Sequence, residues 1–152
     1  MSDDVVTVER VIPAPPEKIF ALISDPKKHT TFDGSGTVKD STEQSDAPLK
    51  LGSTFGMNMR MGGPYTMVNT VTELEPNRRI AWQAHKGTKG IACKLTGRTW
   101  RYELEPVEGG TKVRESWDVT TDGMGWILKR IAAKKTAENM TKTLERIEQA
   151  LS

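Results

Sequence analysis

The sequence predicts an α+β domain in which a curved antiparallel sheet of about seven strands is covered by one long C-terminal helix, with an apolar cavity between them. Strand-like segments separated by turn sequences fill most of the chain from residue 37 to residue 119. The last segment instead repeats apolar residues at alternating spacings of four and three, which is the period of an amphipathic helix. We expect residues 1–152 to form a single domain with one core.

One strand and two short helices are expected before the main part of the sheet. β-branched residues predict a strand over Val5–Ile12. Pro16 then opens a helix over residues 15–23, since proline fits the first turn of a helix. Asp25 followed by Pro26 repeats this start signal as a capping residue and a proline, which predicts a second short helix to about residue 32.

Six further strands and a long helix are expected after these short helices. Turn-favouring residues separate the strands, whose expected ranges are 37–44, 54–61, 65–75, 78–86, 98–107 and 111–119. The segment 87–97 contains the single cysteine, Cys93, and is interpreted either as a loop or as part of a long hairpin. The final helix is expected to start near Gly125 and to run for ~26 residues.

The turns also predict which residues of neighbouring strands share a face, because opposite residues in an antiparallel pair point the same way. A two-residue loop at Gly109-Gly110 pairs Trp100 with Val119, Tyr102 with Trp117 and Leu104 with Glu115. The opposite face then carries the charged pairs Arg101–Asp118 and Glu105–Arg114. Aromatic residues on one face and complementary charges on the other support this register.

Two earlier hairpins extend the same apolar face. The Pro76-Asn77 turn pairs Val71 with Trp82, Asn69 with Ala84 and Glu73 with Ile80. At Gly62-Gly63-Pro64, a two-residue loop would place the methionines of the preceding strand on the face away from Trp82. A three-residue loop instead pairs Met59 with Met67, Met57 with Asn69 and Phe55 with Val71, so we predict an odd-numbered loop or a bulge there.

One inner face, opposite the C-terminal helix, therefore collects the large apolar residues of the sheet and a few polar ones. The candidate ligand-binding residues are Phe55, Met57, Met59, Met67, Asn69, Val71, Trp82, Trp100, Tyr102, Glu115, Trp117 and, from the helix, Met140. Methionines give an adaptable wall and tryptophans give flat platforms for a ligand. Both residue types also fill ordinary packed cores, so their presence alone leaves both interpretations open.

Glu115 is a carboxylate on a face that is otherwise largely aromatic. Burial disfavours the charged form, which would suit a general acid or base or an anchor for a ligand hydroxyl. The alternative is that Glu115 lies near the open end of the sheet and reaches water or a basic side chain. Asn69 and Tyr102 could bind a ligand carbonyl or phenol, or they could satisfy each other or a buried water.

Several segments of the sequence are similar to the START-like, or SRPBCC, superfamily of helix-grip proteins. These segments are Ile12–Phe20 (IPAPPEKIF), Leu51–Phe55 (LGSTF), Val71–Trp82 (VTELEPNRRIAW) and Trp100–Thr111. The order of strand, two short helices, six strands and long helix resembles that superfamily over the whole chain. The superfamily includes polyketide cyclases, the birch pollen allergen group and lipid-transfer domains, which share a scaffold while their ligands differ.

The resemblance and the apolar face together suggest a protein that binds a small hydrophobic molecule: a lipid, an isoprenoid or a polyketide-like aromatic. The resemblance also allows an enzyme that cyclises or dehydrates a polyketide-like substrate. In that enzyme Glu115 would act as acid or base and Tyr102 would polarise a carbonyl. The predicted inner face contains no histidine or arginine, which argues against this second function.

A third function would use the surface of the C-terminal helix. Lys129, Arg130, Lys134 and Lys135 cluster in its first half, where they could contact an anionic lipid surface or an acidic partner. A solvated face with pairs such as Lys134–Glu138 is the simpler interpretation.

Composition excludes several other classes. A net charge of +2 gives no indication of a nucleic-acid partner. His29 and His85 lack spaced partners for a metal site, and no cofactor motif is visible. The single cysteine rules out an internal disulfide and, with an acidic N-terminus in which no signal peptide is visible, favours a reducing cytoplasm. We expect a monomer.

Overall fold

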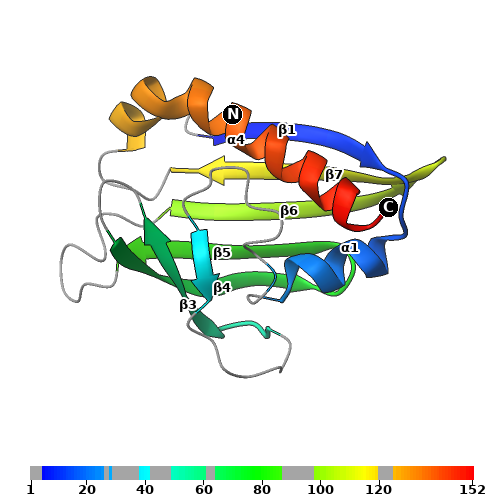
Figure 1. Cartoon of the computed structure of the whole chain (residues 1–152), viewed down its shortest axis with the longest axis horizontal. Helices are drawn as coiled ribbons and strands as arrows, with labels where there is room; N and C mark the ends of the chain where they lie inside the picture. The colour runs from blue at the N-terminus through cyan, green and yellow to red at the C-terminus, as the bar shows by residue number, and fades with distance from the viewer. Residues whose placement is uncertain are drawn as a thin grey trace.

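The computed structural model describes residues 5–25, 28, 38–41, 49–60, 64–86, 98–119 and 125–152 (Figure 1). Its elements are β1 (Val5–Ile12), α1 (Pro16–Ile23), β2 (Val38–Ser41), β3 (Thr54–Arg60), β4 (Pro64–Glu75), β5 (Arg79–Lys86), β6 (Arg98–Val107), β7 (Gly110–Asp118) and α4 (Gly125–Ala150). These ranges follow the sequence prediction closely. The second short helix expected at residues 25–32 lies outside the described residues apart from positions 25 and 28, and the segment 87–97 lies wholly outside them.

The seven strands form one antiparallel sheet in the order β1-β7-β6-β5-β4-β3-β2. The first strand of the chain therefore pairs with the last one, and each remaining pair of neighbours consists of strands that follow one another in the sequence. Helix α4 packs chiefly along β1 and to a lesser extent on β7, while α1 lies near the end of β6 (Figure 1). The buried residues of the apolar stripe on α4 are Met140, Leu144 and Ile147, which confirms the spacing predicted for this helix.

The hairpin between β6 and β7 differs in register from the prediction. The observed pairs are Trp100–Trp117, Tyr102–Glu115 and Leu104–Val113, and Val107 pairs with Gly110. The turn therefore lies at Glu108-Gly109, and each predicted partner is wrong by two residues. A shift of two residues preserves the alternation of faces, so the predicted apolar and charged faces are correct although the pairs are not.

The end of β1 explains this register. Gly109 adopts a φ of 88°, which favours glycine in the turn. At Gly110 a Cβ atom would lie 2.1 Å from the carbonyl oxygen of Ile12, so only glycine fits beside the end of β1. The close approach of two strands therefore determines which glycine belongs to the turn and which to β7.

The hairpin between β4 and β5 is confirmed in one half and wrong in the other. Asn69 pairs with Ala84 and Val71 with Trp82, as predicted, but Glu73 pairs with Ala81 instead of Ile80. A bulge between Val71 and Glu73 inserts one extra residue into β4. Leu74 consequently pairs with Ile80, and the turn closes through Asn77 with a φ of 62°.

The hairpin between β3 and β4 has the predicted odd loop, because Arg60 pairs with Pro64 and residues 61–63 lie between them. Its pairs are again shifted by two residues, to Phe55–Asn69, Met57–Met67 and Met59–Tyr65. The odd-numbered loop, which sets the face on which each residue of β3 lies, is therefore confirmed. The side chains of Phe55, Met57, Met59 and Met67 lie outside the described part of the chain.

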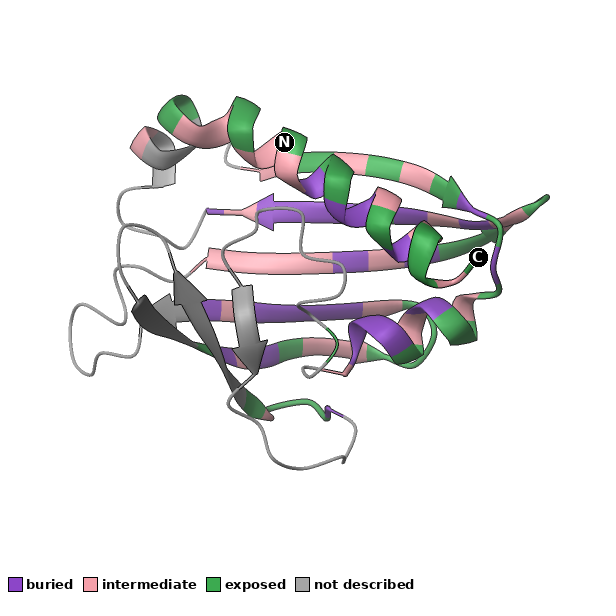
Figure 2. Ribbon diagram, viewed as in Figure 1, coloured by how far each residue is buried: buried purple, intermediate pink, exposed green. Residues whose placement is uncertain are grey.

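The core lies between the inner face of the sheet, α4 and α1 (Figure 2). Helix α1 contributes Ile19, Leu22 and Ile23, and α4 contributes Leu144 and Ile147. A smaller cluster of Trp117, Val119 and Met140 continues the core toward the other end of α4.

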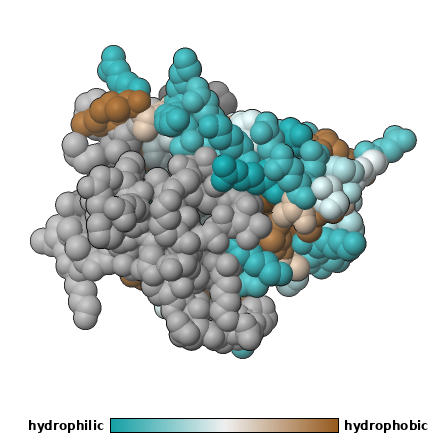
Figure 3. Space-filling model, viewed as in Figure 1, coloured by the Kyte–Doolittle hydropathy of each residue, from teal (hydrophilic) through white to brown (hydrophobic). Residues whose placement is uncertain are grey.

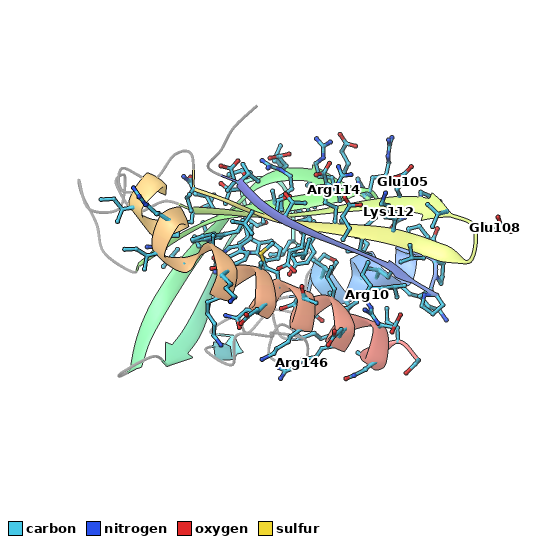
Figure 4. The ribbon with its side chains drawn as sticks, turned by 90° about the horizontal axis from the view of Figure 1, so that it is seen from above. Arg10, Glu105, Glu108, Lys112, Arg114 and Arg146 are labelled. Atoms are coloured by element: carbon cyan, nitrogen blue, oxygen red, sulfur yellow. The ribbon has the colours of Figure 1, made fainter. Side chains whose placement is uncertain are left out.

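The outer face of the sheet carries a network of charges (Figure 4). Arg79 lies 3.5 Å from Glu103, and Arg114 lies 3.3 Å from Glu9. Arg101 faces Ser116 in the register, yet it reaches Asp118 diagonally at 3.6 Å, so this predicted charge pair forms through a different geometry.

The second predicted charge pair on this face is wrong, because Glu105 faces Lys112 and not Arg114. A polar depression of about 130 Å³ lies on the same face, lined by Glu75, Arg78, Arg79, Glu103, Leu104, Glu105, Lys112 and Arg114.

Candidate functional site

The centre of the inner face holds a buried polar pair, Tyr102 on β6 and Glu115 on β7. The Tyr102 hydroxyl donates a hydrogen bond to Glu115 Oε1 at 2.8 Å. Tyr102 is 4% exposed and Glu115 is 2% exposed, so the alternative in which Glu115 reaches water is wrong. The two residues meet because they are direct cross-strand partners, a pairing that the predicted register missed by assigning Leu104 to Glu115.

Tryptophans from three adjacent strands surround this pair. Trp82 pairs with Trp100, and Trp100 pairs with Trp117, which places one indole on each of β5, β6 and β7. The rings of Trp82 and Tyr102 lie 5.7 Å apart, and those of Trp100 and Trp117 lie 6.2 Å apart, in tilted arrangements. Such geometry is favourable for aromatic pairs. Trp82 and Trp117 are buried, whereas Trp100 is only partly buried.

The remaining candidates divide into two groups. Asn69 and Val71 are buried on β4 next to the tryptophan strands, and Met140 of α4 belongs to the same cluster as Trp117. The structure therefore brings together eight of the predicted residues, listed as Asn69, Val71, Trp82, Trp100, Tyr102, Glu115, Trp117 and Met140. The other four candidate residues, on β3 and in the first half of β4, are placed on this face by their backbone register alone. They are Phe55, Met57, Met59 and Met67.

Arg10 is an inner-face residue that the sequence reasoning missed. It pairs with Val113 in the register of β1, between Val8 and the buried Ile12. The expectation that no arginine lies on this face is therefore wrong. The strand alternation was the available signal, because Ile12 and Arg10 occupy positions of the same parity in β1.

The guanidinium of Arg10 lies at the edge of the site, between β1 and α4 (Figure 4). Its Nη2 donates a hydrogen bond to Glu148 Oε2 at 2.9 Å. This hydrogen bond to the Glu148 carboxylate raises the pKa of Arg10. Arg10 therefore joins the sheet to the helix and lies two residues along β1 from Val8, the direct partner of Glu115.

The described residues give no indication of a metal site or of a membrane-spanning helix. Among them, no three histidine, cysteine, aspartate or glutamate side chains are grouped as metal ligands. In the same part of the chain, no helix has the length and apolar character needed to cross a bilayer.

A long C-terminal helix packed on an antiparallel sheet, after a strand and a short helix, defines a helix-grip protein of the START-like type. Residues 4–152 match the family described as polyketide cyclase / dehydrase and lipid transport. The chain belongs to that family.

Comparisons with individual proteins support the same fold. The chain is 34% identical over 114 residues to the protein Rv0088 of Mycobacterium tuberculosis. That match covers 74% of this chain and 46% of the relative, so the chain spans about half the length of the curated relative.

Two solved structures illustrate the likeness in fold. Protein CV1439 from Chromobacterium violaceum superposes with a TM-score of 0.73 at 15% identity, over 98% of this chain and 97% of that one. DynU16, a protein in the dynemicin biosynthetic locus, superposes with a TM-score of 0.66 at 15% identity, over 99% of this chain and 48% of that one. Identities this low show a shared fold.

Proposed function

We propose that the protein binds a small hydrophobic molecule between the inner face of the sheet and α4. The observation that carries this proposal is the hydrogen-bonded Tyr102–Glu115 pair, buried among tryptophans. A buried carboxylate costs free energy, and an apolar pair would pack as well at this position. Retaining a polar pair there supports a role in orienting a ligand, with apolar burial supplying the affinity.

The placement of α4 supports the same proposal. The helix packs mainly along β1, whereas the candidate residues extend across β7, β6 and β5 to β4. Trp100 keeps part of its surface accessible although it belongs to the inner face. A ligand could therefore reach the tryptophan surface without first displacing α4 from β1.

Titration of delipidated protein tests this function. We expect long-chain alcohols, isoprenoid alcohols or flat aromatic polyphenols to change tryptophan fluorescence saturably, because three indoles line the candidate site. A Val71→Trp substitution should weaken binding by filling the inner face. The matched control is Val11→Trp, because Val11 is half-exposed on β1. If no class in this panel binds saturably, the proposed function is wrong.

Acid–base catalysis is a second candidate, favoured by the phenol and the carboxyl group held 2.8 Å apart. Such a pair could polarise a substrate carbonyl and transfer a proton to or from it. A Glu115→Gln variant should then bind the substrate but lose turnover by 10²-fold or more. Turnover that survives this change would eliminate Glu115 as the acid or base.

The first half of α4 supports a third candidate, contact with an anionic membrane surface. Ile131 is 79% exposed and lies among the exposed side chains of Arg130, Lys134 and Lys135. Figure 3 shows apolar surface beside hydrophilic side chains at this end of the helix. The fourth predicted residue, Lys129, has a side chain outside the described part of the chain.

This combination of an apolar side chain and adjacent cations is typical of helices that bind anionic lipid surfaces. Lys134→Glu with Lys135→Glu should abolish sedimentation with phosphatidylserine vesicles. Lys142→Glu, on the later half of the helix, should reduce it far less. Equal binding to vesicles of phosphatidylcholine alone would contradict the electrostatic part of this candidate.

A further inference from the structure

The inner face of the sheet has a second polar region, at the end where β6 begins. Arg98 is the first residue of β6 and pairs with Ala84 of β5, which in turn pairs with Asn69 of β4. The register runs without a shift from Arg98 to Tyr102, so Arg98 lies on the same face as Trp100 and Tyr102. An amide and a guanidinium therefore flank a small alanine, with their backbones about 10 Å apart.

This end of the inner face is positively charged. Of the described inner-face residues on β1 and on β4 to β7, Glu115 is the one acid. Its row of the sheet lies about 13 Å further along β6 from Arg98. The first half of α4 lies toward the same end as the start of β6 (Figure 1), and its Ala132 packs against the cluster that contains Val119. The exposed cations of this half of the helix are Arg130, Lys134 and Lys135.

The Arg98 guanidinium can hold an acidic group in addition to the interaction in which it already takes part. A guanidinium carries five N–H donors in a planar fork, so one acceptor leaves others for a carboxylate. Bidentate pairs of arginine and carboxylate are among the stronger hydrogen bonds in proteins. Arg98 is partly buried, which reduces the screening of its charge by water.

We infer that the site takes hydrophobic molecules that end in an acidic group, with the acid on Arg98 and the apolar part over Trp100 toward Tyr102. The inference rests on the proposed binding function and names its ligand class. Coulomb energies fall with distance, so a carboxylate in contact with Arg98 gains more there than it loses by repulsion from the distant Glu115, in either protonation state of Glu115. An alcohol of the same length lacks this charge-assisted contact.

Three molecules of one chain length test this selectivity: dodecanoate, dodecan-1-ol and dodecyltrimethylammonium, each titrated into delipidated protein at pH 8. We expect dodecanoate to bind more tightly than the alcohol by about tenfold or more, and the ammonium compound to bind most weakly, because charge-assisted hydrogen bonds are about twice as strong as neutral ones. Arg98→Gln should weaken dodecanoate alone and bring its affinity to within about twofold of the alcohol. Arg114→Gln is the matched control. It removes the same charge from the outer face, where Arg114 lies beside Glu9, and should leave the preference unchanged.

The outcomes separate this inference from the function on which it depends. Alcohol binding as tight as that of dodecanoate would overturn the selectivity while leaving hydrophobic binding intact. A preference for dodecanoate that survives in Arg98→Gln would also overturn it, because another group would then hold the acid. Failure of all three molecules and of the wider panel above would contradict the binding function itself, and the inference with it.

An unchanged affinity for dodecan-1-ol shows that Arg98→Gln is folded. If that variant does not fold, Arg98→Lys provides the second test. Lysine keeps the charge but loses the planar fork, so the preference for dodecanoate should fall to about threefold. A preference as large as that of the wild type in this variant would overturn the role of Arg98.

Discussion

Arg10 on β1 and Glu148 on α4 form an ion pair at 2.9 Å across the contact between the edge strand of the sheet and the long helix. The two side chains come from opposite ends of the sequence, and α4 makes its main contact with the sheet along this strand. The pair therefore helps to fix the position of the helix over the inner face. Because both side chains are partly exposed, water and salt screen their attraction.

Arg10→Ala and Glu148→Ala should each lower the free energy of unfolding, and a double-mutant cycle should give a coupling of about 0.5–1 kcal/mol. The coupling should shrink in 1 M salt, since the Debye length there is about 3 Å. Urea denaturation of the four proteins measures it. A coupling that is zero at low salt would show that the ion pair does not position α4.

Gly110→Ala should destabilise the protein by about 3 kcal/mol or more, because a Cβ there would lie 2.1 Å from the Ile12 carbonyl oxygen. The atoms that this Cβ would meet belong to the backbone of Ile12 and Pro13, so relief requires β1 or β7 to move. Gly109→Ala is the matched control. Its φ of 88° disfavours alanine, but no atom lies within 4 Å, and we expect a loss of about 1 kcal/mol. Similar losses for the two variants in thermal unfolding would contradict this account of the turn.

The sequence predicted the faces of the sheet better than its pairs. Side chains alternate between the two faces along each strand, so a register that is wrong by two residues still gives the right faces. This is the case for β6 with β7 and for β3 with β4. The pairs depend on where each turn closes, and that position is set by contacts between distant segments. At Gly110 the deciding contact is with Ile12, which no local turn rule includes. At Thr72 the bulge depends on how β4 bends across the sheet.

For the candidate site as well, the sequence predicted which residues share a face but not which side chains are in contact. Composition and alternation indicated that Trp82, Trp100 and Glu115 would share a face, but the hydrogen bond to Tyr102 depends on the exact register. The contact of Arg10 was not predicted, because its partner Glu148 lies on the helix, 138 residues further along the chain. Ion pairs between such distant segments have no local sequence signal.

Glu9 should make the protein sensitive to acid. A hydrogen bond from Lys112, assisted by the Arg114 charge, lowers the pKa of Glu9 below its usual value of 4.5. A lowered folded-state pKa stabilises the fold above pH 4.5, and this contribution is lost as the pH falls through the folded-state value. Glu9→Gln should therefore be less stable than the wild type at pH 7, and this deficit should be smaller at pH 3.

Urea unfolding at the two pH values measures this difference, which should be small because Glu9 is partly exposed. Glu108→Gln is the control, since Glu108 lies at the tip of the β6–β7 hairpin, away from the sheet (Figure 4). The difference in unfolding free energy between Glu108→Gln and the wild type should be the same at pH 7 and at pH 3. A Glu9→Gln deficit that is as large at pH 3 as at pH 7 would indicate lost packing instead of lost charge.

Tyr102→Phe should destabilise the protein by about 1–3 kcal/mol, because it removes the hydroxyl that donates to the buried Glu115 carboxylate. Adding Glu115→Leu should recover most of that loss, since replacing both partners by apolar groups removes the need for a hydrogen bond. The same double variant should bind the long-chain alcohols of the ligand panel more weakly than the wild type, because it has lost the polar pair that, under the proposed function, orients the ligand. Denaturant unfolding and ligand titration on the same preparations measure both effects. A double variant that regains stability and also binds these alcohols as tightly as the wild type would show that the polar pair serves the fold and not the ligand.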